Sequence, residues 1–313
     1  MVAKPCQVKI LIAKKSGNRV AEMSSHTLFE TMKTLAPDEA SRVKMVLDRG
    51  VKIPPQPRVL EELRKLMLRK EFDVRLLSRI INQDPGIAAL LFKVVSNAAY
   101  RQHQPFESIE DILHAVGVRQ TFNLVQAIAL TSVGGAKKHP QVYEAFWARS
   151  QTIAQFAMLI ADERVAVCNI FPDQAYIAAI FHDCGVLLQL QRFPTYCAEM
   201  RLAEPGRWVH VAEEDKKFNA DHCVVGYIVA RHWCLPEFIC DAIRFHHDIR
   251  HLGQHVSRTM VAILQLAAEL YYRDLRVPNP EWDLVKSEVL PELGLDEGAL
   301  PEFSDIITER FHN

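Results

Sequence analysis

The stretch Asp84-Pro85-Gly86-Ile87-Ala88-Ala89-Leu90-Leu91-Phe92-Lys93-Val94-Val95 has the signature of a short buried helix. Its aliphatic side chains recur three or four positions apart, which places them on one face of a helix. Asp84 is a suitable N-cap acceptor, and Pro85 suits the first helical position. The signature recurs in two further segments, residues 74–81 after Asp73 and residues 109–116 after Ser108. The sequence therefore predicts an all-α protein of short helices packed on one another.

Composition narrows the class of protein further. The chain has 313 residues, 37 basic and 38 acidic side chains, a hydrophobic share of 49% and seven cysteines without a C-x-x-C pair. This balanced charge argues against broad binding to nucleic acid or to an acidic membrane. No apolar run approaches the roughly 18 residues that span a bilayer, and residues 8–13 are too short for a secretory signal. We therefore expect a cytoplasmic protein with free thiols and no membrane partner.

Proline and glycine interrupt the helical pattern at two places. Residues 53–57, Ile-Pro-Pro-Gln-Pro, exclude a helix because proline lacks an amide donor and restricts the residue before it. Gly134-Gly135 mark a softer boundary. Beyond it, helices are expected around residues 142–162, 173–190, 220–232 (with Asn219 as N-cap), 236–247 and 258–273, and two short ones in the tail from residue 278.

These boundaries predict four segments. They are an amino-terminal extension (1–50), a helical bundle (51–135), a second helical half (136–275) and a helical tail (276–313). Within the extension, residues 7–13 are expected to form one strand and residues 28–47 one or two helices.

One constellation of histidines and carboxylates could carry chemistry. It consists of Phe181-His182-Asp183-Cys184-Gly185, Asp221-His222 and His246-His247-Asp248. Imidazoles and carboxylates are the ligand set that suits first-row divalent metals. Neighbouring residues on a helix point about 100° apart, so His182 and Asp183 can reach one site only near a helix end or between helices. By spacing alone, ordinary surface or core histidines explain the pattern better than a metal site does.

Taken in series, these and other motifs resemble the HDOD family, the HD-related output domain of bacterial signalling proteins. The matching pieces are residues 53–57, 81–85, 96–100, 109–112, 117, 146–150, 181–185, 221–226, 232–236 and 242–247. The resemblance leaves the first fifty residues uncovered. It implies that the amino-terminal helical bundle packs on an HD-like helical domain.

Catalytic HD and HD-GYP relatives hold divalent metals with the pattern H…HD…H…HH…D, whereas HDOD members usually lack this ligand set and act without catalysis. The resemblance implies that the metal positions of this chain are His182, Asp183, His222, His246 and His247. The first histidine of the pattern is replaced by Arg149, and the final aspartate falls on Ala268. Glu269 is one residue further on, about 100° around the helix.

These two losses predict a vestigial metal site. Only one carboxylate remains, so two clustered dications would be poorly neutralised. Arg149 is always protonated, and its guanidinium can form a bidentate pair with Asp183 that fills the electrostatic role of a metal. We therefore expect an Arg149–Asp183 pair, no resident cofactor, and a pocket suited to a small anion or nucleotide.

The sequence favours a non-enzymatic regulatory module that contacts other signalling proteins. The alternative is a metal-dependent phosphohydrolase, acting on phosphomonoesters or cyclic dinucleotides with a single divalent metal in an atypical site, so enzyme activity is left open. A third interpretation is nucleic-acid binding through Lys9, Lys14, Lys15 and Arg19. The same charges are more simply explained as a solvated face.

Overall fold

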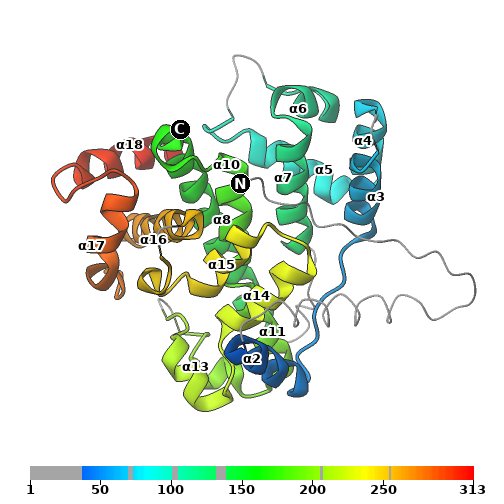
Figure 1. Ribbon diagram of the computed structural model, residues 1–313. Coiled ribbons are helices and arrows are strands. Elements are labelled where there is room, and N and C mark those ends of the chain that lie inside the picture. Colours follow the sequence, from blue (N-terminus) through cyan, green and yellow to red (C-terminus); the bar gives the residue numbers. More distant parts are fainter. Residues whose placement is uncertain (1–36, 70–72, 101–104, 132–138, 205–206, 254) are drawn as a thin grey trace, which may run out of the picture.

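The computed structural model describes residues 37–69, 73–100, 105–131, 139–204, 207–253 and 255–313, and all regular elements within these ranges are helices (Figure 1). The all-α class is thus confirmed. The expected strand at residues 7–13, the first part of the helical stretch at 28–47 and the boundary at Gly134-Gly135 lie outside the described residues. Within the described ranges, no helix combines the length and the apolarity needed to cross a membrane.

The first half of the chain forms a group of short helices, α3 to α7, beside the rest of the molecule (Figure 1). The bounds are α2 Pro37–Asp48, α3 Arg58–Met67, α4 Val74–Ile81, α5 Pro85–Val95, α6 Ile109–Ala115 and α7 Val118–Thr131. The three expected N-caps are confirmed: Asp73, Asp84 and Ser108 each accept a hydrogen bond from a backbone amide in the first turn of α4, α5 and α6. Residues 51–57 contain no helix, as their prolines predict.

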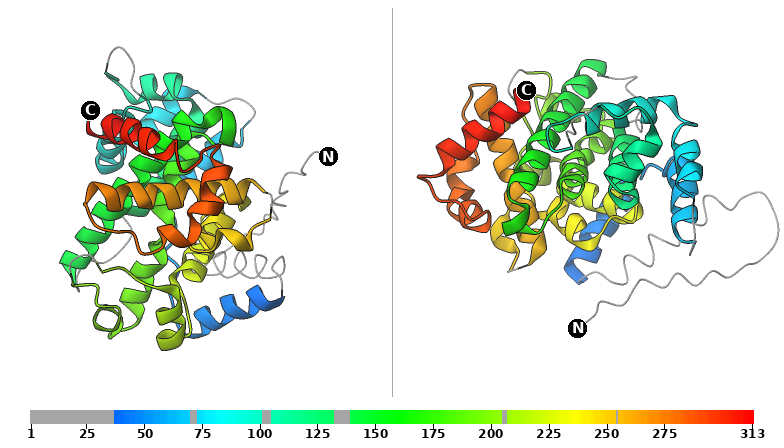
Figure 2. Two further views of the ribbon diagram at one scale, coloured as in Figure 1. Left: turned by 90° about the vertical axis from the view of Figure 1, so that its left-hand side faces the viewer. Right: turned by 90° about the horizontal axis from the view of Figure 1, so that it is seen from above.

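The second half of the chain surrounds the long helix α8 and the buried helix α10. The bounds are α8 Pro140–Glu163, α9 Val165–Cys168, α10 Pro172–Phe181, α11 Cys184–Arg192, α12 Tyr196–Glu199, α13 Val211–Phe218, α14 His222–His232, α15 Glu237–Phe245, the 3₁₀ turn η1 Ile249–His251, α16 Val256–Asp274, α17 Trp282–Glu292 and α18 Leu300–His312. The two expected tail helices are therefore present as α17 and α18. Figure 2 shows α18 lying beside α8, where Arg310 pairs with Asp162 and Glu163.

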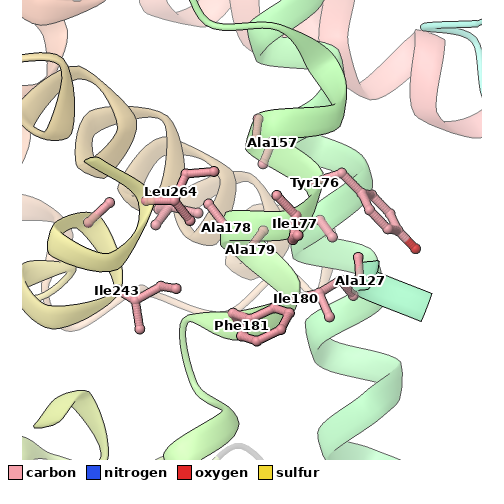
Figure 3. Close-up of a cluster of buried hydrophobic side chains, with 14 of the residues drawn as sticks. Ala127, Ala157, Tyr176, Ile177, Ala178, Ala179, Ile180, Phe181, Ile243 and Leu264 are labelled. Carbon is pink, nitrogen blue, oxygen red and sulfur yellow. The ribbon is translucent and has the colours of Figure 1, made fainter. Parts of the chain in front are cut away.

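The larger of two buried apolar clusters surrounds α10, and a smaller one lies between the start of α8, α11 and α12. Figure 3 shows side chains of α7, α8, α15 and α16 gathered around this helix, among them Ala127, Ala157, Ile243 and Leu264. Small residues on α10, such as Ala178 and Ala179, lie in this packed region. Because α10 is fixed on several sides, the residues that follow its carboxyl end are held in place as well.

Two expectations about helix ends are wrong. The segment expected as one helix over 173–190 is divided, because α10 ends at Phe181 and α11 begins at Cys184. Asn219 does not cap α14: it ends α13 with φ of +50°, and the side chain of Asp221 caps α14 by accepting from the amide of Val224 at 2.7 Å. Asparagine tolerates the left-handed conformation that ends α13, which explains its position there.

The close contact at Gly185 explains why the chain turns between α10 and α11. A Cβ added to Gly185 would lie 2.1 Å from the carbonyl oxygen of His222, far inside van der Waals contact. The start of α11 therefore packs directly against the start of α14, and only glycine permits this approach. The turn places His182 and Asp183 next to His222.

Candidate functional site

The structure brings together all five histidine and aspartate candidates. His182 and Asp183 form the turn between α10 and α11, and His222 is the first residue of α14. His246 and His247 follow directly after α15. Four of the five are buried, and the side chain of His247 is 21% exposed. The site is thus built where three helix ends meet, which is how adjacent residues can both reach it.

Asp183 lies at the centre of the site, with one oxygen saturated by donors. Its Oδ2 accepts from Arg149 Nη1 at 2.5 Å and from Trp208 Nε1 at 2.9 Å, and lies 2.9 Å from His182 Nε2. The Arg149 guanidinium also stacks over the Trp208 ring at 4.2 Å. Burial alone raises the pKa of Asp183, but His182 and Arg149 outweigh it and hold that pKa well below its usual range. The expected contact with Arg149 is present, though through a single nitrogen rather than a bidentate pair.

The other oxygen of Asp183 faces a cluster of imidazole nitrogens. Asp183 Oδ1 lies 3.3 Å from both His222 Nε2 and His246 Nε2 and, among the described residues, has no hydrogen bond of good geometry. His222 Nε2 is itself 3.3 Å from His246 Nε2 and 3.2 Å from His247 Nε2. Three ring nitrogens therefore lie close together, and the carboxylate oxygen lies beside two of them.

The outer nitrogens of the same three rings each face an acceptor. His222 Nδ1 lies 2.5 Å from Glu214 Oε2, His247 Nδ1 lies 2.8 Å from Glu281 Oε2, and His246 Nδ1 lies 2.8 Å from the carbonyl oxygen of Ile243. An acceptor at Nδ1 requires the proton there, so in the neutral rings the converging Nε2 atoms carry lone pairs. This is the arrangement that orients metal-binding histidines, and the donor set fits a divalent cation.

In place of a metal ion, protons on the histidine rings could also stabilise the converging Nε2 lone pairs. Burial alone lowers the pKa of His246, but Cys223 and Asp183 together raise it to about 10. The pKa of His247 falls to about 4, because burial and the charge on His246 both oppose its protonation. The rings therefore cannot all be protonated at once.

Glu214 is a functional residue that the sequence analysis missed. It is fully buried and accepts from the backbone amide of His222, at 3.1 Å, as well as from its ring. Its other oxygen accepts from Gln189 Nε2 at 2.8 Å and from the Tyr196 hydroxyl. A sequence signal was present, because Glu214 shares a helical stripe with the apolar residues Val211 and Phe218.

Asp248, Ala268 and Glu269 supply no side-chain ligand to the cluster. Asp248 is exposed and lies 3.9 Å from Arg250. Ala268 lines the cavity described below, whereas Glu269 turns away and pairs with Arg273 at 2.7 Å. Helix α16 therefore supplies no carboxylate to the site. Trp208, Glu281 and Cys223 contact the site but were not predicted as members, because only the tertiary fold brings the first two to it.

A cavity of about 360 Å³ opens over the site. Its walls include Arg149, the exposed Arg207, Trp208 and Tyr272, and its floor includes Asp183 and His246. This volume is within the range of small-molecule sites. Two guanidinium groups and an aromatic ring give it the chemistry of an anion site.

Fold and site together define an all-α protein of the HD type, with a histidine–aspartate cluster at the meeting point of helix ends. The HDOD domain profile matches residues 53–249. This chain therefore belongs to the HDOD family.

One protein of known sequence and two of known structure resemble this chain at low sequence identity. An uncharacterized protein of Treponema pallidum (strain Nichols) is 23% identical over 212 residues, which cover 66% of this chain and only 40% of that relative. A Shewanella amazonensis SB2B protein that bears the provisional name of a phosphohydrolase is 18% identical, with TM-score 0.61 and coverage of 91% and 95% of the two chains. An HDOD domain protein of unknown function from Geobacter sulfurreducens is 20% identical, with TM-score 0.55 and coverage of 93% and 99%. These likenesses show the shared fold.

Proposed function

We propose that the protein is a non-catalytic HDOD regulatory module that acts through contacts with signalling proteins. The observation that carries this proposal is the bond from Arg149 Nη1 to Asp183 Oδ2. In the HD pattern that the chain resembles, the matching aspartate binds metal and a histidine stands in place of Arg149. In this chain the permanently charged guanidinium of Arg149 donates a hydrogen bond to one oxygen of that aspartate, Asp183.

Charge balance supports the loss of two-metal chemistry. Asp183 is the one carboxylate that the cluster offers directly, and Arg149 already neutralises it. Ala268 stands where the pattern has its second acid, and Glu269 points to Arg273. Two dications close together need several carboxylates, so a paired-metal site has too little negative charge here.

The division into a bundle half (51–135), an HD-like half (136–275) and a tail (276–313) belongs to the same proposal. The tail contributes to the site, because Glu281, directly before α17, accepts from His247. A change in the tail would therefore reach the histidine cluster. This link offers a route by which a partner that contacts the tail could influence the pocket, or the reverse.

The second candidate function is hydrolysis of a phosphate ester by a single metal. Asp183 Oδ1, which makes no hydrogen bond to a described residue and lies beside two imidazole nitrogens, favours it, as does the anion-suited cavity above. A bound metal would supply an activated water and polarise the phosphoryl group. In that case Arg149 and Arg207 would hold phosphate oxygens within the cavity.

The test is activity of protein purified without chelator. Phosphomonoesters and cyclic dinucleotides are offered with Mg²⁺, Mn²⁺, Fe²⁺ or Zn²⁺, and the wild-type chain is expected to show no turnover above the metal blank. The double variant Arg149→His with Ala268→Asp restores both missing ligands and is expected to bind more metal than the parent. Wild-type turnover that disappears in Asp183→Ala would overturn the proposal and establish the second candidate.

A further inference from the structure

Cys223 extends the histidine cluster on the side away from the cavity. It follows His222 in the first turn of α14, and its Sγ lies 3.5 Å from His222 Nε2. One ring nitrogen from each of His222, His246 and His247 and this sulfur all lie within 4.8 Å of one another. A thiol is thus the fourth neighbour of three nitrogens whose lone pairs converge.

The three separations measured from His222 Nε2 match the edges of a tetrahedral coordination shell. With Zn–N near 2.05 Å and Zn–S near 2.3 Å, tetrahedral angles give N···N edges of about 3.3 Å and N···S edges of about 3.6 Å. The observed N···N separations are 3.3 Å for His222–His246 and 3.2 Å for His222–His247. The sulfur is 3.5 Å from His222 Nε2. Three edges of the tetrahedron therefore have the right length already.

The burial of the four residues separates this shell from the anion cavity. His246 and His247 line the cavity, but the lining residues do not include His222 or Cys223, which are 0% and 2% exposed. An ion held by all four would lie beneath the cavity floor. Arg149 lies on the far oxygen of Asp183, so its charge is directed at the carboxylate rather than at this shell.

We propose that His222, Cys223, His246 and His247 bind one zinc-like cation in a closed three-nitrogen, one-sulfur site. A thiolate ligand selects Zn²⁺ and Co²⁺ over Mg²⁺ and Mn²⁺. Four protein ligands leave no open position, which is typical of a structural rather than a catalytic metal. Glu214, Glu281 and the carbonyl of Ile243 orient the three rings by accepting from their Nδ1 atoms. The ion would fasten the end of α15 to the start of α14.

Cobalt is the probe that reports the sulfur ligand directly. Chelator-stripped full-length protein is titrated with Co²⁺ under reducing conditions without oxygen. We expect one equivalent to bind, with the visible bands of tetrahedral Co²⁺ and a near-ultraviolet thiolate-to-cobalt charge-transfer band. Cys223→Ser is expected to lose the charge-transfer band. Cys240→Ser is the matched control, because this buried thiol contacts the carbonyl of Leu235 instead of the cluster, and both features are expected to persist.

Three results of the cobalt titration would overturn the proposal: no binding of Co²⁺, a charge-transfer band that persists in Cys223→Ser, or octahedral Co²⁺ spectra. Zinc X-ray absorption of the wild-type protein provides a measurement that needs no variant, and one sulfur with three nitrogens is the expected shell. A shell without sulfur would also overturn it. Phosphatase assays on the same metal-loaded sample separate the two proposals, since turnover with an intact sulfur band contradicts only the proposed function.

Discussion

Arg149 and Asp183 come from different helices and meet through a single bond, Nη1 to Oδ2, in a site where their side chains are 10% and 1% exposed. Trp208 contacts both partners: its ring lies against the guanidinium, and its indole N–H donates to the same carboxylate oxygen. The carboxylate is thereby held charged and oriented, with its second oxygen turned to the histidines. Residues of α8 and of the loop before α13 thus fix the centre of the HD-type cluster.

Removing the arginine leaves this buried carboxylate without its cation. Arg149→Ala is expected to lower the free energy of unfolding by about 3–5 kcal/mol, as for other buried pairs that lose one partner. Urea unfolding of the chelator-treated protein measures it. The control is Arg201→Ala, whose exposed pair with Glu204 is screened by solvent and is expected to contribute little to the free energy of unfolding. Similar losses in both variants would mean that Asp183 is not held by Arg149.

The four donors around Glu214 require a carboxylate rather than an amide. One oxygen accepts from Gln189 and the Tyr196 hydroxyl, and the other from the amide and ring of His222. In Glu214→Gln the amide NH₂ must face two of these donors, so we expect a loss of about 1–3 kcal/mol in the free energy of unfolding. Tyr196→Phe removes one bond and is expected to cost about 1 kcal/mol. Denaturant titrations compare the two variants, and a loss in Glu214→Gln smaller than the loss in Tyr196→Phe would contradict the four-donor geometry.

A buried carboxylate outside the site gives a pH dependence of stability. Asp173 Oδ2 accepts from Asn123 Nδ2 at 2.7 Å, while its Oδ1 has no hydrogen bond to any described residue. Burial raises the pKa of Asp173, and the bond from Asn123 and the charge of Arg119 only partly offset this. The buried Tyr100 hydroxyl is also nearby; burial is the largest cause that raises its pKa, and the charge of Asp173 adds to it.

The sign follows from proton linkage. The unfolded pKa of an aspartate is about 3.9, and above it the folded state retains the proton longer than the unfolded state does. Stability contributed by Asp173 is therefore lost as pH rises from the unfolded pKa through the raised folded pKa. The Asp173→Asn variant has no carboxyl group to titrate and does not lose this stability. The melting temperature of the variant minus that of the wild-type protein should therefore be larger at pH 7 than at pH 4. Thermal unfolding at the two pH values measures the difference, and a constant difference would contradict it.

Local chemistry explains which parts of the fold could be predicted from the sequence. The caps at Asp73, Asp84 and Ser108 depend on hydrogen bonds that span two or three residues. The local sequence is therefore enough to predict them. The placement of Ala268 in the cavity wall and of Glu269 away from it follows from the helical period.

Long-range contacts explain what could not be predicted. Asn219 and Asp221 are both good N-caps, and the choice between them depends on the left-handed end of α13, a helix that the pattern did not indicate. The break at His182 depends on the packing of Gly185 against His222 at the start of α14. These two residues are 37 positions apart in the sequence. Glu214 is a carboxylate beside apolar residues on one helix face, but its three partner residues, Gln189, Tyr196 and His222, are set by the tertiary fold.

Gly185 is the position where a single methyl group should disturb the whole cluster. In Gly185→Ala the new Cβ would lie 2.1 Å from the His222 oxygen and 2.8 Å from its carbonyl carbon, so backbone must move. We expect a loss of about 3 kcal/mol in the free energy of unfolding, at the upper end for overpacked sites, together with weaker Co²⁺ binding because His222 shifts. Gly253→Ala is the matched control, since its Cβ would meet nothing within 4 Å. Urea unfolding and Co²⁺ titration of both variants decide the matter: unchanged stability and cobalt affinity in Gly185→Ala would mean that α11 and α14 do not pack this closely.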